Sequence, residues 1–353
     1  MTRLISTDIS CQVSSSVSRV YAGNCGDNKW RREEFGFTQH YANHDNMCHE
    51  CCAKMSGPLS YANALPNAPW TEAPRELADV FDGIMGQEKD FPLTRLEGFH
   101  VQNNFQDLVH DDLLGLRPHA CGATPKNLCD EGTWGAFGSI GNWSDRLDSQ
   151  LKVAFEQFCL VSKGRRFEHS QAVFSHLNLS MKRKTSESIV KAKATNCQVV
   201  SSWLLDMCES SIDTEFKRMQ ALMMRGFNDS YLIAERTTFP NFVLDDSQAE
   251  SLETARKQML LGYHWLAKYN VSRGWSQYHL IPKFHYLDHA LRRAVRTKVS
   301  PSIFWCFAQE SKMGETARLV HKLHGASSMR RGIGRWLVSF FFQLEESDEC
   351  SAA

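Results

Sequence analysis

Long apolar runs are missing from this sequence. No stretch of the 353 residues approaches the roughly 18 consecutive apolar residues that a transmembrane helix needs, and residues 1–16 hold no uninterrupted apolar segment of the kind that directs export. We therefore expect no membrane partner and an intracellular location. The 12 cysteines are expected to stay reduced, because disulfide frameworks are typical of exported chains.

Strand patterns, internal repeats and low-complexity tracts are scarce as well. Residues 13–21 are the one stretch with the character of a strand. The chain is 42% hydrophobic, which is enough apolar material for a packed core. The spacing of apolar residues predicts helices over 76–85, 146–162, 186–208, 252–269, 287–295 and 316–323. We expect a mainly α fold with a small mixed α/β core.

Composition divides the chain into five segments. A cluster of prolines between residues 58 and 74 separates the first two. The segments are a Cys/His-rich N-terminal part with a first strand (1–60), a core segment (61–144), a helical region (145–280), a basic segment (281–340) and a disordered tail (341–353).

Positive and negative residues balance overall but are unevenly distributed along the chain. The formal charge is zero, which excludes a uniformly basic nucleic-acid-binding protein, yet residues 281–336 contain eleven Lys or Arg and three Asp or Glu. This excess predicts a basic face that contacts phosphates, although a solvated helix surface gives the same count. The candidate nucleic-acid-binding residues are Lys283, Arg292, Arg293, Arg296, Lys298, Arg330 and Arg331.

Cys48 and Cys51 have the Cys-x-x-Cys spacing with which two thiolates bind one zinc ion from a tight turn. A structural zinc site needs four ligands, and ordinary buried thiols are the alternative interpretation. The missing pair is left open among His40, His44 and His49 nearby and Cys25, Cys121 and Cys129 farther along the chain.

His285 and His289 are four residues apart, so they share one face of a helix that starts directly after Pro282. Two histidines so spaced can bind a metal ion. They can equally hydrogen-bond to the backbone or to neighbouring helices.

Asp107 and His110 lie in a short acidic segment that continues with Asp111 and Asp112. Hard divalent cations prefer oxygen ligands, and a neighbouring His can orient them, so this segment is a candidate metal site. The alternative is that Asp107 caps a helix whose first turn holds the other two acids. Asp27 and Glu310 are further candidate acids, the latter after an aromatic block.

Short motifs follow one another in a characteristic order from residue 25 to about residue 325. They include Gly26-Asp27-x-Lys29-Trp30, Cys48-His49-x-Cys51, Asp107-x-x-His110, Pro282-Lys283-Phe284-His285 and Trp305-Cys306-Phe307 with Glu310. Together they resemble CACTA-type transposases, most closely the degenerate transposase-like proteins present in many copies in some unicellular algal genomes.

The resemblance implies a partial RNase H-like sheet with a large helical insertion, acting on DNA in the nucleus. By motif position, it implies that Asp107, Asp27 and Glu310 are catalytic carboxylates that bind Mg²⁺ or Mn²⁺, with His110 as their partner. The first hypothesis is therefore a transposase-derived, truncated protein of the two-metal strand-transfer type, whose activity and oligomeric state the sequence leaves open. The alternative is a non-catalytic, zinc-stabilised helical protein that binds nucleic acid or a protein partner.

Overall fold

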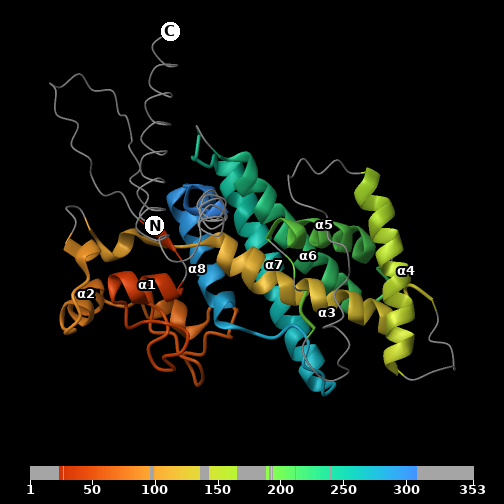
Figure 1. The fold of residues 1–353 in the computed structure, drawn as a ribbon, viewed down its shortest axis with the longest axis horizontal. Helices are drawn as coiled ribbons and strands as arrows, with labels where there is room; N and C mark the ends of the chain where they lie inside the picture. The colour runs from red at the N-terminus through yellow and green to blue at the C-terminus, as the bar shows by residue number, and fades with distance from the viewer. Residues whose placement is uncertain are drawn as a thin grey trace, which may run out of the picture. The chain divides into compact units, whose positions relative to one another are not determined.

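A computed structural model of the chain describes residues 24–26, 28–95, 99–135, 143–164, 188–190, 192, 194–210, 212–238 and 241–307. This part of the chain is mainly helical (Figure 1). The α-helices are α1 (Asn28–Phe35), α2 (Leu77–Met85), α3 (Arg117–Asp130), α4 (Trp143–Gly164), α5 (Ala194–Glu209), α6 (Glu215–Arg236), α7 (Asp246–Ser272) and α8 (Pro282–Thr297). Short 3₁₀ turns lie at Pro69–Glu72, Pro92–Arg95, Val101–Asn103 and Pro301–Phe304, and Val109–Leu116 is a π-helix.

Helices α6 and α7 form the most extensive helix pair. Their backbones approach so closely that a Cβ atom on Gly226 of α6 would lie 2.5 Å from the carbonyl oxygen of Ala255 of α7. Gly262 of α7 faces Met219 and Met223 of α6 in the same way, so the two helices run antiparallel. A capping box of Asp245 and Gln248 fixes the start of α7.

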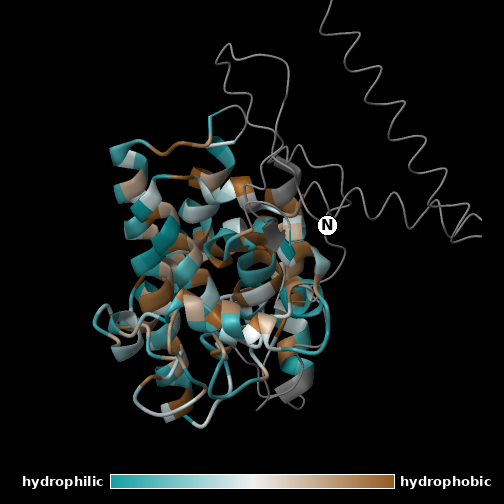
Figure 2. Cartoon of the chain, turned by 90° about the vertical axis from the view of Figure 1, so that its left-hand side faces the viewer, coloured by the Kyte–Doolittle hydropathy of each residue, from teal (hydrophilic) through white to brown (hydrophobic). Residues whose placement is uncertain are grey.

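The main hydrophobic core lies among α3, α4, α5, α6, α7 and α8, and it includes the fully buried side chains of Phe158, Trp203, Phe227 and Tyr263. Figure 2 shows hydrophobic and hydrophilic positions interspersed along the helices of the chain, as expected for elements that bury one face. Arg117 is a charged residue inside this core. Its guanidinium is fully buried and forms an ion pair with Asp112, so the core is not purely apolar.

The N-terminal part packs around two short strands. Strands β1 (Asn24–Gly26) and β2 (Asn104–Gln106) pair in parallel, with Gly26 opposite Gln106. Helix α1 contacts β1, and α1 and α2 share a separate apolar cluster that contains Phe35, Phe37, Val80, Ile84, Phe91 and Val101.

The mainly α prediction is confirmed. The helices predicted over 76–85, 146–162, 252–269 and 287–295 correspond to α2, α4, α7 and α8, whereas the helix predicted over 186–208 begins later, at Ala194. Helices α1, α3 and α6 were not predicted individually. The strand predicted over 13–21, the helix over 316–323 and the tail 341–353 lie outside the described residues. The boundaries of the five segments stay predictions.

Among the described residues, no helix has both the length and the apolar character that crossing a bilayer requires. The described residues as far as Trp305 belong to one compact unit, and Cys306 and Phe307 belong to a second.

Candidate metal centre

Cys48 and Cys51 lie in a loop whose shape is set by hydrogen bonds. The backbone N–H of Glu50 donates to Cys48 Sγ over 3.4 Å, which closes a tight turn between the two cysteines. Arg75 holds this turn from outside: its Nε donates to the Cys48 carbonyl oxygen (3.0 Å) and its backbone N–H to the Glu50 carbonyl oxygen (3.1 Å). These bonds shape the turn that carries the two cysteines.

His285 and His289 come from the first half of α8. Pro282 occupies the first turn of this helix, where the missing N–H of proline costs nothing, so the helix starts early enough to include both histidines. Tyr286, which follows His285, donates its hydroxyl hydrogen to the carbonyl oxygen of Met47 over 2.7 Å. This bond ties α8 to the cysteine loop.

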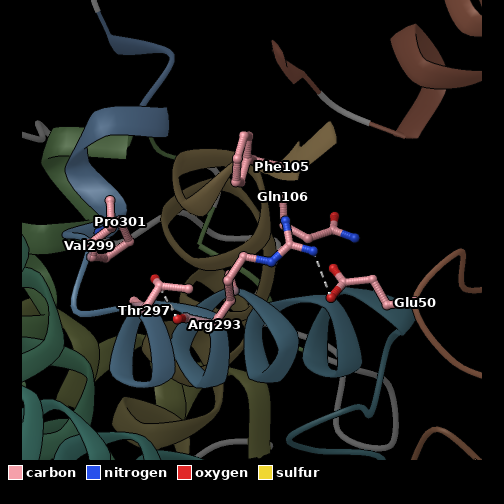
Figure 3. A pocket seen from close by; sticks show the side chains of 9 residues that line it. Glu50, Phe105, Gln106, Arg293, Thr297, Val299 and Pro301 are labelled. Carbon is pink, nitrogen blue, oxygen red and sulfur yellow. Dashed lines mark hydrogen bonds and ion pairs between the residues drawn. The ribbon is translucent and has the colours of Figure 1, made fainter. Parts of the chain in front are cut away.

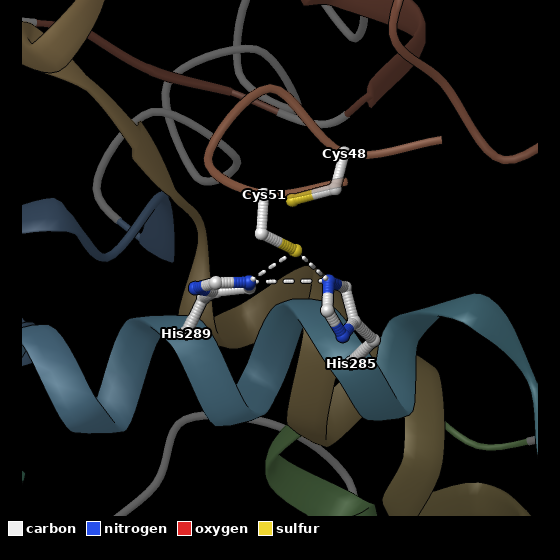
Figure 4. A group of neighbouring side chains, drawn as sticks. All are labelled: Cys48, Cys51, His285 and His289. Carbon is white, nitrogen blue, oxygen red and sulfur yellow. Dashed lines mark hydrogen bonds between the residues drawn. The ribbon is translucent and has the colours of Figure 1, made fainter. Parts of the chain in front are cut away.

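The two pairs meet in space (Figure 4). Cys51 Sγ lies 3.3 Å from His285 Nε2 and 3.3 Å from His289 Nε2, and the two Nε2 atoms are 3.1 Å apart. All four ligand atoms, including Cys48 Sγ, lie within 4.8 Å of one another. In a tetrahedral zinc site with Zn–N of about 2.0 Å and Zn–S of about 2.3 Å, ligand atoms are about 3.3 to 3.8 Å apart. The spacing matches such a site.

The cluster is shielded from water. Cys48 and His285 are fully buried, Cys51 is 2% exposed and His289 is partly buried. The indole of Trp70 covers both imidazoles, with ring centroids 4.4 Å from His285 and 5.4 Å from His289. A closed set of two thiols and two imidazoles is the ligand set of structural zinc sites, because catalytic sites keep one position open.

The charges of the cluster already favour a thiolate. Burial opposes ionisation of the Cys48 thiol, but the hydrogen bond from Cys51 and the positive charge of His289 lower its pKa well below the usual value. Burial also opposes protonation of His289, yet the negative charges of Cys48 and Glu50 raise its pKa to about 9. The hydrogen bond to Cys48, together with burial, raises the pKa of Cys51. A divalent cation would replace these shared protons.

Each half of this cluster was singled out from sequence spacing, but the halves were not joined. The structure supplies His285 and His289 as the partners of the cysteine pair. The partners considered from the sequence lie elsewhere: Cys121 and Cys129 are buried in the helical core, and His49 lies against Arg31 and Phe37. Two complementary half-motifs, Cys-x-x-Cys and His-x-x-x-His, were the signal that could have joined them.

Asp107 and His110 are in contact. Asp107 is 1% exposed; its Oδ1 accepts a hydrogen bond from the backbone N–H of Val109 (3.0 Å), and its Oδ2 lies 2.5 Å from His110 Nδ1. The segment that follows is the π-helix, a form often found at functional sites. The bond from Val109 agrees with the capping interpretation of Asp107, and the metal-site interpretation stays a prediction.

Asp111 and Asp112 differ in their surroundings. Asp112 pairs with Arg117 inside the core. Asp111 is also buried, but its Oδ2 has no hydrogen-bond partner among the described residues. Burial raises the pKa of Asp111 to about 7, against the opposing positive charges of Arg31 and Lys283.

Most of the candidate phosphate-binding cations that the structure describes already bond within the protein. Lys283 donates to the carbonyl oxygen of Leu114, while Arg292, Arg293 and Lys298 form ion pairs with Asp288, Glu50 and Asp246. Arg296 is exposed on α8. Arg330, Arg331, Asp27 and Glu310 lie outside the described residues.

No model of a known protein family matches this chain, and neither a curated protein nor a solved structure matches it.

Proposed function

We propose that this chain is a zinc-binding protein in which one structural Cys₂His₂ site fastens the cysteine loop to helix α8. The observation that carries the proposal is the convergence of Cys48, Cys51, His285 and His289 within 4.8 Å in a buried, closed cluster. Two thiolates balance the charge of a divalent cation, and soft sulfur with imidazole nitrogen favours zinc over magnesium or calcium.

The metal's role is architectural. Cys51 and His285 are 234 positions apart in the sequence. A bond through one ion between such distant residues removes much of the freedom of the unfolded chain, and metal-binding free energy then contributes to folding free energy. No position is left for a reacting water molecule.

Metal content tests this proposal. We expect protein produced with zinc to carry one zinc ion per chain by elemental analysis, and the cobalt-substituted protein to show the visible absorption of a tetrahedral thiolate site. Cys51→Ser should lose both properties. Cys52→Ser is the matched control, because Cys52 is the next residue and lies outside the ligand set. Metal-free wild-type protein, or a Cys51→Ser variant that keeps its zinc, would refute the assignment.

A second candidate function is strand transfer on DNA by a transposase-derived protein, located in the nucleus. The observation that favours it is the parallel pairing of β1 with β2. Gly26 of β1 pairs with Gln106 of β2. In the sequence, Asp27 directly follows Gly26 and Asp107 directly follows Gln106. The carboxyl ends of parallel strands are where α/β sheets hold ligands. A partial RNase H-like sheet is the arrangement to which this pairing would belong.

In this second function, Asp107 and Asp27 would bind Mg²⁺ or Mn²⁺, Glu310 would complete the set, and His110 would orient Asp107. Nicking of supercoiled plasmid that requires Mg²⁺ and is lost in Asp107→Asn would support it. Asp246→Asn, an exposed acid on α7, is the control. Salt-sensitive DNA binding without nicking would instead support a non-catalytic nucleic-acid-binding protein.

A further inference from the structure

Glu50 lies between the two cysteines and touches the outer side of the metal centre. Its Oε2 lies 3.6 Å from His289 Nδ1, while the other ring nitrogen of His289 faces the ligand cluster. A histidine that binds a metal through Nε2 carries its proton on Nδ1, and an acceptor on that side fixes both the tautomer and the ring orientation.

Arg293 holds Glu50 in this position. Its Nη2 lies 3.0 Å from the same Oε2 atom, one helical turn beyond His289 (Figure 3). The guanidinium also lies 5.1 Å from the ring centroid of Phe105 and donates to the Gln102 carbonyl oxygen over 3.3 Å. Arg293 therefore connects three parts of the chain: the cysteine loop, α8, and β2 with the residues just before it.

One side of the ion pair borders a cavity and is not packed against other side chains. A cavity of about 210 Å³ lies beside the ion pair and is lined by Glu50, Phe105 and Arg293 among others. The side chains of Glu50 and Arg293 are only 15% and 17% exposed. Because little water reaches these two charges, their attraction is stronger than that of an exposed pair.

We propose that Glu50 is the positioning residue of the zinc centre: its carboxylate attracts the Nδ1–H side of the His289 ring by charge and, anchored by Arg293, holds the imidazole with Nε2 toward the metal. This inference rests on the proposed zinc site. It also reassigns Arg293, which the sequence placed among the phosphate-binding cations, to support of the metal centre.

Zinc affinity measured by competition with a chromophoric chelator tests the role of Glu50. We expect Glu50→Gln, which keeps an oxygen acceptor but loses the charge, to weaken zinc binding about tenfold, and Glu50→Ala to weaken it up to about a hundredfold. Glu72→Gln and Glu72→Ala are matched controls, because Glu72 is an exposed glutamate in the short helix that also carries Trp70. Both controls should bind zinc as the wild type does.

A spectroscopic readout separates positioning from general destabilisation. Nitrogen NMR of the zinc-loaded protein should show the His289 Nδ1 proton protected from exchange in the wild type and the Glu72 variants, and exchanging faster in Glu50→Gln and Glu50→Ala. Unchanged zinc affinity and unchanged exchange in both Glu50 variants would overturn the inference while leaving the zinc site intact. Wild-type protein that binds no zinc would overturn the proposed function itself.

Discussion

At the scale of single residues, the Asp111 carboxyl stands out because it is buried and its Oδ2 has no hydrogen-bond partner among the described residues. Four charged groups act on it electrostatically: Arg31 of α1, Lys283 of α8, and the nearby Asp107 and His110. Neither cation forms a hydrogen bond with its Oδ2. Burial is therefore the dominant influence, and the pKa of Asp111 is raised to about 7.

This raised pKa predicts how stability depends on pH. In the unfolded chain Asp111 ionises near 3.8, but in the folded protein only near 7, so its contribution to stability falls as pH rises between these values. Asp111→Asn removes this loss. We expect the gain in unfolding free energy from the substitution to be larger at pH 8 than at pH 5 by about 2 to 3 kcal/mol, measured by urea denaturation.

Asp246 supplies a control, because its pKa is shifted in the opposite direction to that of Asp111. The hydrogen bond and charge of Lys298 lower the pKa of this exposed carboxyl. Its contribution to stability is therefore present above its unfolded pKa and lost as pH falls, so Asp246→Asn should not reproduce the pattern of Asp111→Asn. A pH-independent difference between Asp111→Asn and the wild type would contradict the prediction.

At the scale of elements, glycines mark where helices touch. In α6, a Cβ on Gly226 would lie 2.5 Å from Ala255 O and 2.5 Å from Met259 N, both backbone atoms of α7. Because backbone cannot rotate away as a side chain can, Gly226→Ala should force the helices apart. We expect a loss of about 1 to 3 kcal/mol in unfolding free energy, despite the better helix propensity of alanine.

The same substitution in α2 should have the opposite effect. A Cβ on Gly83 would meet only Thr38 Oγ1, at 3.8 Å, which is an ordinary contact. Gly83→Ala should therefore stabilise the protein by about 0.5 to 1 kcal/mol through helix propensity alone. Thermal unfolding of the two variants in parallel checks both signs, and destabilisation by both would show that the α6–α7 contact is not the cause.

Burial hides the sequence pattern of two of the helices that were not predicted, α3 and α6. Residues 117 to 129 of α3 are buried except for His119, and polar residues such as Lys126 and Asn127 are among them, so no polar face distinguishes the helix. In α6, Lys217, Gln220 and Asn228 are buried and interrupt the apolar spacing. By contrast, α7 keeps a regular apolar stripe and was predicted.

At the scale of the whole molecule, the candidate site depends on a pairing that no local pattern contains. Spacing within each half was readable, because Cys-x-x-Cys and a histidine pair four residues apart are local features. Their meeting depends on how α8 packs against the loop, through contacts such as the bond from Tyr286 to Met47. Glu50 was equally invisible, since its partners Arg293 and His289 lie far along the chain.

Metal removal should therefore act on one part of the molecule. The cluster of Cys48, Cys51 and Trp70 is separate from the large core among α3 to α8. Chelation should release the loop while that core stays folded, because its apolar contacts do not include the metal. We expect a lower melting temperature, nearly unchanged helical circular dichroism and new proteolytic cleavage within residues 41–60. Cys51→Ser should show these changes even without chelator, whereas Cys52→Ser should show them only after chelation. Identical digestion of loaded and chelated protein would show that no metal holds the loop.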